Sequence, residues 1–496
     1  MATGNPLDLP EIRQKIATYL NKCEKACCLT VCKAWYASFL PFIWKDINVV
    51  HGVHSQGPTP DVLQYHRTMV HTLAISSNAP GLYAFNYPNL NTLLLRTTDR
   101  KRDYSIGAEP TALILLNPSL TCLELFNMEG YLYGPFWRAV SNLPHLRTLR
   151  LYGPIAGSEE LYTFWSPRRL RIDNTVGSNG LSRDILIDMT FPQIRCLGLD
   201  GLKGPNAQDQ LQLLIQCPGL ESLSWTSSWA GMGTVGSKFS EYVRRGAWPH
   251  LKILYLHFIL QDGEIGQILG GLQKAAKLGF MNTGFGNHAY WCLQHHFSTL
   301  KELDLRSCKD VTSIMIKEIL CSCSLLEVFK SGSVLAKVTL EGRPWVCMLM
   351  KSLTINFLFE PDEEELQQLI FGRLAHLMHL EILNAGYEIG MENEGTAVET
   401  QSLNFRLENG LDTLANLTQI KLLTFIGTRQ SLEEKEIAWM AEHWASLLYL
   451  GGRLCPDAEK NRILRDLAQL HGIFEIPSIN GLLMDVLEAR VLSIAL

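Results

Sequence analysis

The chain is 496 residues long; 47% of its residues are hydrophobic and 19% are charged, which excludes a disordered chain and supplies apolar material for a large core. Its 44 Lys and Arg residues against 49 Asp and Glu residues give a net charge of −5, so the overall charge does not favour nucleic acid or an anionic membrane as a partner. At about 100–200 residues per ordinary domain, we expect several domains or one elongated repeat array.

The start of the chain and its cysteines bear on the compartment. Residues 1–12 have no basic stretch followed by an apolar one, and no run of about 18 apolar residues occurs, so we expect neither a secretory signal nor a membrane-spanning helix. The 13 cysteines are an odd number. We therefore expect an intracellular protein, cytoplasmic or nuclear, with reduced cysteines and no glycan at the sequon Asn416-Leu417-Thr418.

The first 50 residues predict a small helical domain. Residues 8–11 (Asp-Leu-Pro-Glu) are typical of a helix start, because proline is favoured in the first turn and acidic residues suit the positive end of the helix dipole. Apolar residues follow at helical spacing up to Leu20, and a second apolar helix is expected over 26–35. We assign 1–50 to this domain and 51–69, which begins with several Gly and Pro residues, to a linker.

From residue 70 to 450 one phrase, L-x-x-L-x-L, recurs mostly about 24–31 residues apart, close to the period of leucine-rich repeats. The clearest copies begin at Leu90, Leu120, Leu146, Ile194, Leu220, Leu251 and Leu300. Weaker copies begin near Leu325, Met350, Leu377, Leu417 and Leu447, and degenerate ones lie at 170–172 and 278–280.

Each copy predicts a short strand followed by a helix. The leucines at alternate positions point inward and the residues between them point to solvent. Helical patterns lie between the copies, as at 209–215 and 311–320. The fold class is therefore α/β, a solenoid with a curved parallel sheet and helices on its convex side, because one unit alone cannot bury its apolar face. Residues 451–496 are expected to form a helical cap.

The cysteines of the repeats have a packing explanation. Cys217, Cys308 and Cys323 fall where a cysteine-containing subtype of the repeat has a small buried residue. In the N-terminal segment, Cys23, Cys27, Cys28 and Cys32 have helical spacing and lack the close Cys-x2-Cys pairs of zinc sites. A cluster at 292–296 and another at 321–323 lack a second ligand pair. We therefore expect no metal and no cofactor.

Residues 231–236 match G-x-G-x-x-G, the phosphate-binding phrase of dinucleotide sites. The acidic residue that such a site needs after the next strand is absent, so we interpret the stretch as a loop between repeats. We also expect that this loop and its surroundings could contact a partner through Trp225, Trp229, Lys238, Arg244, Arg245 and Trp248. The sequence has no phosphate loop, no nucleophile elbow and no H-E-x-x-H motif, so no enzymatic activity is expected.

Residues 7–45 resemble an F-box. The matching phrases are 9–12 (Leu-Pro-Glu-Ile), Ile16, 19–20 (Tyr-Leu), 31–35 (Val-Cys-Lys-Ala-Trp) and 40–44 (Leu-Pro-Phe-Ile-Trp). The stretch 21–26 departs from the Asp-Leu pair that opens the second helix in many F-boxes. Residues 70–450 resemble the leucine-rich repeats that often follow an F-box.

The resemblance implies a role as substrate-recognition subunit of a Skp–cullin–F-box ubiquitin ligase, with the F-box on a Skp-type adaptor, which links it to a cullin–RING ligase, and a target protein on the concave face of the repeats. The adaptor surface that it implies consists of Leu9, Pro10, Ile12, Ile16, Leu20, Val31, Cys32 and Trp35. The alternative is a leucine-rich-repeat scaffold with a degenerate F-box that acts outside a ligase.

Outward-pointing strand residues are the candidates for contacting the target, because Tyr and Arg are enriched at interaction hot spots. The candidates are Arg150, Tyr152, Arg171, Asp173, Tyr255, His257, Asp304 and Arg306, and the same positions include Glu124, Phe126 and Asp200. Arg150 and Arg171 are expected on neighbouring strands, where they could pair with a phosphate on the target.

Overall fold

The structure is a computed structural model, and it describes residues 7, 9–49, 58–76, 80–96, 108–126, 134–153, 189–201, 207–226, 233–360, 363–386 and 401–476. The chain divides into two compact units. Unit 1 comprises Met1–Gly231 and Ala247–His250, and unit 2 comprises Met232–Gly246 and Leu251–Leu496. None of the helices in the described ranges has the length and apolar character needed to span a membrane.

Unit 1 begins with three short helices, α1 (Pro10–Tyr19), α2 (Lys22–Cys28) and α3 (Lys33–Trp44). Pro10 occupies the first turn of α1, as the sequence predicted. Asn21 opens α2: its side chain accepts a hydrogen bond from the Glu24 N–H at 3.0 Å, and the Glu24 carboxylate accepts one from the Asn21 N–H at 2.8 Å. This reciprocal cap lets α2 form without the Asp-Leu pair.

The sheet of unit 1 follows directly. Its strands are parallel, and each pairs with the next one in chain order. They are β1 (Asp46–Val49), β2 (Thr72–Ser76), β3 (Thr92–Arg96), β4 (Cys122–Phe126), β5 (Thr148–Tyr152), β6 (Cys196–Asp200) and β7 (Ser222–Thr226). The sheet therefore starts at Asp46, inside the segment assigned to the helical domain, and the expected linker contains α4 (Pro60–His66).

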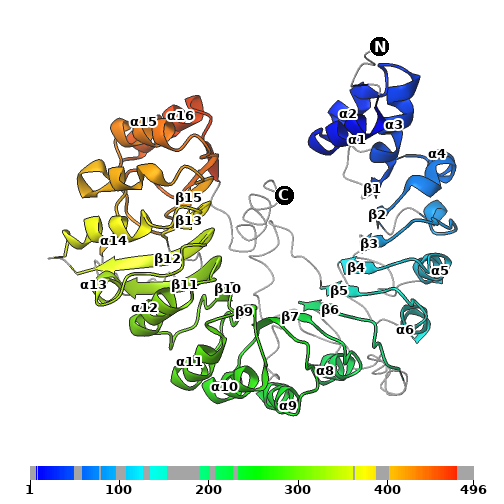
Figure 1. Ribbon diagram of the computed structural model, residues 1–496, viewed down its shortest axis with the longest axis horizontal. Coiled ribbons are helices and arrows are strands. Elements are labelled where there is room, and N and C mark those ends of the chain that lie inside the picture. The colour runs from blue at the N-terminus through cyan, green and yellow to red at the C-terminus, as the bar shows by residue number, and fades with distance from the viewer. Residues whose placement is uncertain are drawn as a thin grey trace, which may run out of the picture. The chain divides into compact units, whose positions relative to one another are not determined.

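The repeat phrase sets the core of unit 1. In the copy that forms β3, Leu90, Leu93 and Leu95 are at most 5% exposed, so the three leucines of the phrase point inward. The helices α5 (Ala108–Leu116), α6 (Gly134–Ser141) and α8 (Ala207–Ile215) lie along one face of the sheet (Figure 1). The short helix η2 (Arg67–Met69) lies between α4 and β2, and η3 (Pro80–Leu82) lies between β2 and β3.

Unit 2 has the same construction. Its strands are β8 (Ile253–His257), β9 (Lys277–Gly279), β10 (Glu302–Asp304), β11 (Val328–Leu335), β12 (Ser352–Phe359), β13 (Ile382–Asn384), β14 (Gln401–Ser402), β15 (Leu422–Thr424), β16 (Tyr449–Gly451) and β17 (Phe474–Ile476). All of these pairings are parallel except that of β14, which runs antiparallel to β12.

The helices of unit 2 again lie along one face of the sheet (Figure 1). They are α9 (Gly233–Arg244), α10 (Asp262–Gly271), α11 (Asn287–Leu293), α12 (Ser313–Ser322), α13 (Ala336–Leu340), α14 (Leu366–Leu374), α15 (Glu434–His443), α16 (Ala458–Leu470) and the 3-10 turns η4 (Gln294–His296), η5 (Leu407–Asn409) and η6 (Leu411–Asn416). In the expected cap, α16 is followed by β17, which pairs with β16, so the repeat pattern continues beyond residue 450.

Three sequence interpretations are wrong. The helix expected over 26–35 is interrupted by a turn, because α2 ends at Cys28 and α3 begins at Lys33. The expected loop at 231–236 is helical from Gly233 onward, where α9 begins. Trp225 and Trp248, which were expected to contact a partner, are at most 5% exposed. The Trp248 indole N–H donates a hydrogen bond to the Leu214 carbonyl at 3.1 Å, so this side chain belongs to the core of unit 1. Trp229 lies outside the described residues.

The packing explanation for the repeat cysteines is confirmed for Cys217 and Cys323, which are fully buried. Cys308 is half-buried, and its thiol donates a hydrogen bond to the Phe280 carbonyl at 2.7 Å. All 13 cysteines are free. Burial raises the pKa of Cys323 to about 12, so its thiol stays protonated and unreactive at neutral pH.

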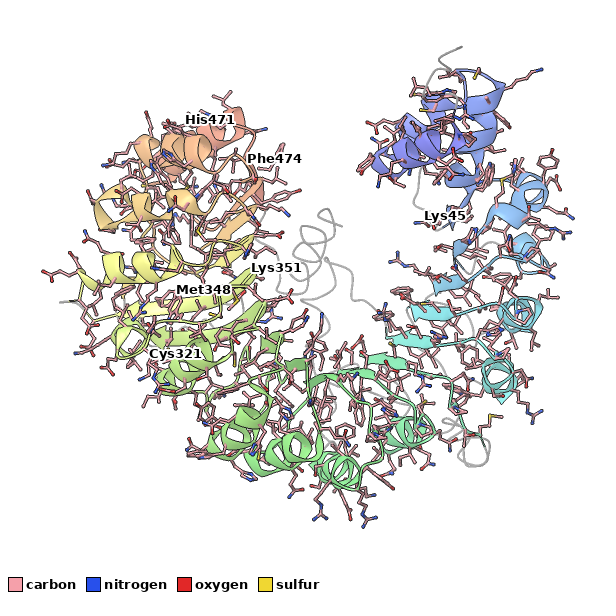
Figure 2. The ribbon with its side chains drawn as sticks, viewed as in Figure 1. Lys45, Cys321, Met348, Lys351, His471 and Phe474 are labelled. Carbon is pink, nitrogen blue, oxygen red and sulfur yellow. The ribbon has the colours of Figure 1, made fainter. Side chains whose placement is uncertain are left out.

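A ladder of alternating charges precedes the strands of unit 2. Lys301, Glu327, Lys351, Glu381 and Lys421 stand on successive rungs, since each of the last four donates its backbone N–H to the carbonyl of the one before at 2.7–2.8 Å. Glu327 contacts Lys301 at 3.5 Å and Lys351, labelled in Figure 2, at 2.8 Å. Opposite charges on neighbouring rungs favour this strand register.

The ladder predicts an acid-sensitive increment of stability. The hydrogen bond from Lys351 lowers the pKa of Glu327 below its ordinary value of 4.5. A carboxylate with a lowered folded-state pKa stabilises the fold above the unfolded-state pKa, and this contribution disappears as the pH falls through the folded-state value. We expect Glu327→Gln to lower the free energy of unfolding by about 0.5–1 kcal/mol at about pH 7, since the pair is partly exposed.

The measurement is urea unfolding of the native chain and of Glu327→Gln from about pH 7 down to about pH 3. The difference between the two should close at the acid end. Glu341→Gln is the control, because Glu341 is exposed and forms no ion pair with any described residue. A difference that stays constant with pH would contradict the prediction.

Candidate functional site

The three N-terminal helices and the residues that flank them expose large apolar side chains. We call Leu7, Leu9, Tyr19, Val31 and Tyr36 the exposed apolar set; their exposed fractions are 41%, 53%, 76%, 61% and 47%. Few side chains are buried among the helices, chiefly Ala17, Phe39 and Arg13. A helical group of this size with so much exposed apolar surface is typical of a segment that a partner covers.

The residues that the F-box resemblance singles out fall into two groups. Leu9, Pro10, Val31 and Cys32 are exposed, so a partner can reach them directly. The half-buried residues are Ile12, Ile16, Leu20 and Trp35. The Trp35 ring stacks on Phe39 at a centroid distance of 5.2 Å, which ties α3 together and leaves part of the indole accessible.

A second surface lies on the sheet of unit 1, on the face opposite the helices. Because side chains alternate between the two faces of a strand, the residues between the buried leucines point to this face. At the carboxyl ends of β3 to β7 they form one row across the strands, which we call the carboxyl-end row: Arg96, Phe126, Tyr152, Asp200 and Thr226. The Phe126 and Tyr152 rings stack in parallel, with centroids 4.6 Å apart and planes 7° apart.

Two positions earlier on the strands, charged side chains pair across the sheet. Arg150 on β5 donates to the Glu124 carboxylate on β4 at 2.7 Å. Gly198, the neighbour of Arg150 on β6, makes room for this side chain, since a Cβ there would lie 3.1 Å from the Arg150 Cγ. Burial and the nearby Glu124 raise the pKa of Tyr152 to about 12, so its hydroxyl remains a neutral hydrogen-bonding group on this face.

These contacts do not form the phosphate-binding pair that was expected from Arg150 and Arg171. Arg150 is engaged by Glu124. Arg171 and Asp173 lie outside the described residues. The pairing of Arg150 with Arg171 therefore stays a prediction from the sequence alone.

On the corresponding sheet face of unit 2, the candidate residues form hydrogen bonds and ion pairs with one another or with neighbouring side chains. Tyr255 on β8 donates its hydroxyl to Glu302 at 2.5 Å, and Glu302 also binds Lys277. Arg306 donates from two nitrogens to both carboxylate oxygens of Asp304, at 2.7–3.1 Å. Asp304 and Arg306 are only 8% and 6% exposed, so we leave them out of the surface that a target can reach.

Of the predicted candidates in unit 2, Tyr255 and His257 remain partly accessible on β8. The Tyr255 ring lies across β9, because Gly279, its neighbour in register, has no side chain. A Cβ at this position would lie 2.4 Å from the Tyr255 Cδ1. The absence of a side chain at Gly279 therefore allows the Tyr255 side chain to cross β9 and to reach Glu302.

This geometry predicts a specific coupling. We expect Gly279→Ala to displace the Tyr255 ring, to break its hydrogen bond to Glu302 and to lower the free energy of unfolding by about 1–2 kcal/mol. The measurement is urea unfolding of Gly279→Ala, of Tyr255→Ala and of the double variant. When residue 255 is already alanine, Gly279→Ala should no longer lower the free energy of unfolding. Strictly additive effects would show that the two positions do not interact in this way.

Sequence reasoning missed Arg96. This side chain is exposed, and it has no ion pair or hydrogen bond in the part of the chain that the structure describes. The signal was present, because Arg96 follows the last leucine of its repeat copy, as Phe126, Tyr152 and Asp200 do in theirs. Within the described residues, no group of three His, Cys, Asp or Glu side chains is placed to hold a metal ion.

The two units share one architecture. Each unit repeats a parallel strand built on the L-x-x-L-x-L phrase, with its helices on one face of the sheet. The fold is a leucine-rich-repeat solenoid. No known protein family matches the chain, and no curated protein matches it in sequence.

Several solved structures align with much of the chain. The yeast Rad7–Elc1 complex aligns with 79% of this chain and 81% of its own, at 16% identity and a TM-score of 0.40. An internalin from Listeria monocytogenes aligns with 86% of this chain and 91% of its own, at 13% identity and a TM-score of 0.30. The TLR13–ssRNA13 complex aligns with 82% of this chain and 58% of its own, at 15% identity and a TM-score of 0.31. Similarity at this level carries no argument about function.

Proposed function

We propose that this chain is the substrate-recognition subunit of a Skp–cullin–F-box ubiquitin ligase. The observation that carries the proposal is the coincidence of two independent features in residues 9–44. The phrases that resemble an F-box lie there, and so do the exposed Leu9 and Val31 on a helical group with little core of its own. A Skp-type adaptor that covered these side chains would remove apolar surface from water.

In this proposal the chain makes no bonds itself. The N-terminal helices tether it to the ligase, and the sheet face of the repeats holds a target protein. The gain is effective concentration, since the target is kept close to a charged ubiquitin-conjugating enzyme. The chain is thus a non-catalytic receptor that works inside the cell, without a cofactor.

A second candidate function is a repeat scaffold that acts outside a ligase. The observation in its favour is β1, which follows α3 almost at once and pairs with β2. The three helices then serve as a cap on the first strand of the sheet. Both functions use the repeats for binding, and they differ only in what the helices contact.

A pull-down of the full native chain with a purified Skp adaptor distinguishes the two. The ligase role predicts a stable one-to-one complex that also recruits the cullin. Absence of binding by a chain that is folded by circular dichroism would reject the ligase role and leave the scaffold. Target binding is scored separately, so failure to find a target does not affect this test.

A further inference from the structure

The carboxyl-end row of unit 1 combines Arg96, which has no ion pair within the described residues, with the partly exposed rings of Phe126 and Tyr152. Arg96 and Phe126 are in register on β3 and β4, and Phe126 stacks on Tyr152 of β5. Leu93 and Leu95 are buried beneath the sheet, so Arg96 projects to the face opposite the helices. Phe126 and Tyr152 are half-buried and Arg96 is exposed, which leaves all three within reach of another molecule.

The sign of the charge changes along the row. Arg96 lies at one end, and Asp200 lies next to the other end, where its carboxylate accepts hydrogen bonds from Thr226 at 2.8 Å and Ser224 at 3.4 Å. The neighbouring charge Arg150 is already balanced by Glu124. A negative group on a partner is therefore attracted to the Arg96 end and repelled from the Asp200 end.

We propose that this row binds an extended protein segment in which an acidic residue precedes or follows an aromatic residue at a spacing of two, with the carboxylate on Arg96 and the ring on the Phe126–Tyr152 stack. An arginine beside partly exposed aromatic rings has the composition of an interaction hot spot. The guanidinium binds a carboxylate with two parallel hydrogen bonds, and flat rings favour another ring over an aliphatic chain.

The spacing follows from sheet geometry. Neighbouring strands are about 4.8 Å apart, so the centre of the Phe126–Tyr152 stack lies about 7 Å from the Arg96 strand. In an extended segment, residues i and i+2 point to the same side and are about 6.6 Å apart. An acidic residue and an aromatic residue separated by one position therefore reach both parts of the row together.

The inference deepens the proposed function, because it states which kind of target segment unit 1 accepts. The row contains none of the residues expected to contact the adaptor, and peptide binding needs no adaptor. A failed adaptor pull-down and a failed peptide experiment are therefore separate results.

The experiment uses the full chain and three dye-labelled ten-residue peptides in fluorescence anisotropy. The peptides are identical except for their central phrase, which is Glu-Ser-Phe, Gln-Ser-Phe or Lys-Ser-Phe. We expect the Glu peptide to bind at least about tenfold more tightly than the Lys peptide, with the Gln peptide between them, and this preference should weaken as salt is added. Equal affinities, or no binding of any peptide, would overturn the proposal.

Variants then locate the site. Arg96→Glu should reverse the preference, so that the Lys peptide binds more tightly than the Glu peptide. Phe126→Ala should weaken all three peptides about tenfold. The matched control is Arg138→Glu, because Arg138 is an exposed arginine on α6 of the same unit. If Arg138→Glu changes the preference as much as Arg96→Glu, the peptides respond to overall charge and the assignment to this row is wrong.

Arg96→Glu tests binding rather than folding, because the side chain is exposed and, in the ranges that the structure describes, has no ion pair or hydrogen bond to lose. Its urea unfolding midpoint should match that of the native chain within error. Reversal of preference in a variant of unchanged stability cannot come from a damaged fold.

Discussion

The double variant Leu9→Asp, Val31→Asp is expected to lose binding to the Skp adaptor by about a hundredfold or more. Each native side chain is more than half exposed in the free chain, so burial in a complex would contribute about 1 kcal/mol or more apiece. Two carboxylates at the same positions would have to be desolvated without partners, which costs several kcal/mol more. The measurement is titration of the adaptor into the full chain by calorimetry.

The same variant is expected to fold. Leu9 is the N-cap residue of α1 and makes no capping hydrogen bond through its side chain, and aspartate is among the best residues at that position. Val31 lies in the turn between α2 and α3. The control is Leu115→Asp on α5, because Leu115 has the same exposed fraction as Leu9, 53%. Retained adaptor binding in the double variant, or equal loss in Leu115→Asp, would argue against the adaptor surface proposed.

Trp225→Ala is expected to lower the free energy of unfolding by about 3–5 kcal/mol. Trp225 takes the place of the last leucine of its repeat on β7 and is fully buried. Its indole N–H donates to the Gln210 side-chain oxygen on α8 at 2.6 Å. Truncation therefore leaves a large cavity between strand and helix, and it removes a hydrogen bond from a glutamine that is itself only 2% exposed.

The measurement is urea unfolding monitored by circular dichroism, with two comparisons. Trp225→Phe keeps most of the volume and should cost less than the alanine variant. Trp291→Ala on α11 should change the stability by no more than about 0.5 kcal/mol, since Trp291 is 64% exposed. A loss in Trp225→Ala below about 1 kcal/mol would show that unit 1 relaxes around the missing ring.

The repeat phrase predicted the strands well because it acts locally. Alternation of leucines fixes which face of a strand is buried, whatever the neighbouring strands are. Leu90, Leu93 and Leu95 illustrate this, and even the degenerate copy at 278–280 forms part of β9. The start of α1 could be predicted equally well, since Pro10 restricts the backbone locally, whatever surrounds it.

Helix α9 shows where glycine content misled the prediction. Glycine lowers helix propensity by only about 1 kcal/mol, and the buried residues Val235, Phe239 and Val243 recur every four positions along the helix. Gly236 is there because α9 packs closely on Leu260, whose side chain would lie 2.7 Å from an added Cβ. The apolar spacing outweighs the glycines once a neighbouring repeat covers it.

The sequence by itself determined the repeat, the direction in which each strand residue points, and the resemblance of residues 7–45 to an F-box. Only the tertiary structure decided which of the outward residues are available to a partner. Asp304 and Arg306 neutralise each other and are buried, whereas Arg96 stands exposed beside Phe126. The direction of a side chain is set by its own strand, but its partners and its exposure depend on the strands and helices packed around it, which spacing along the chain does not specify.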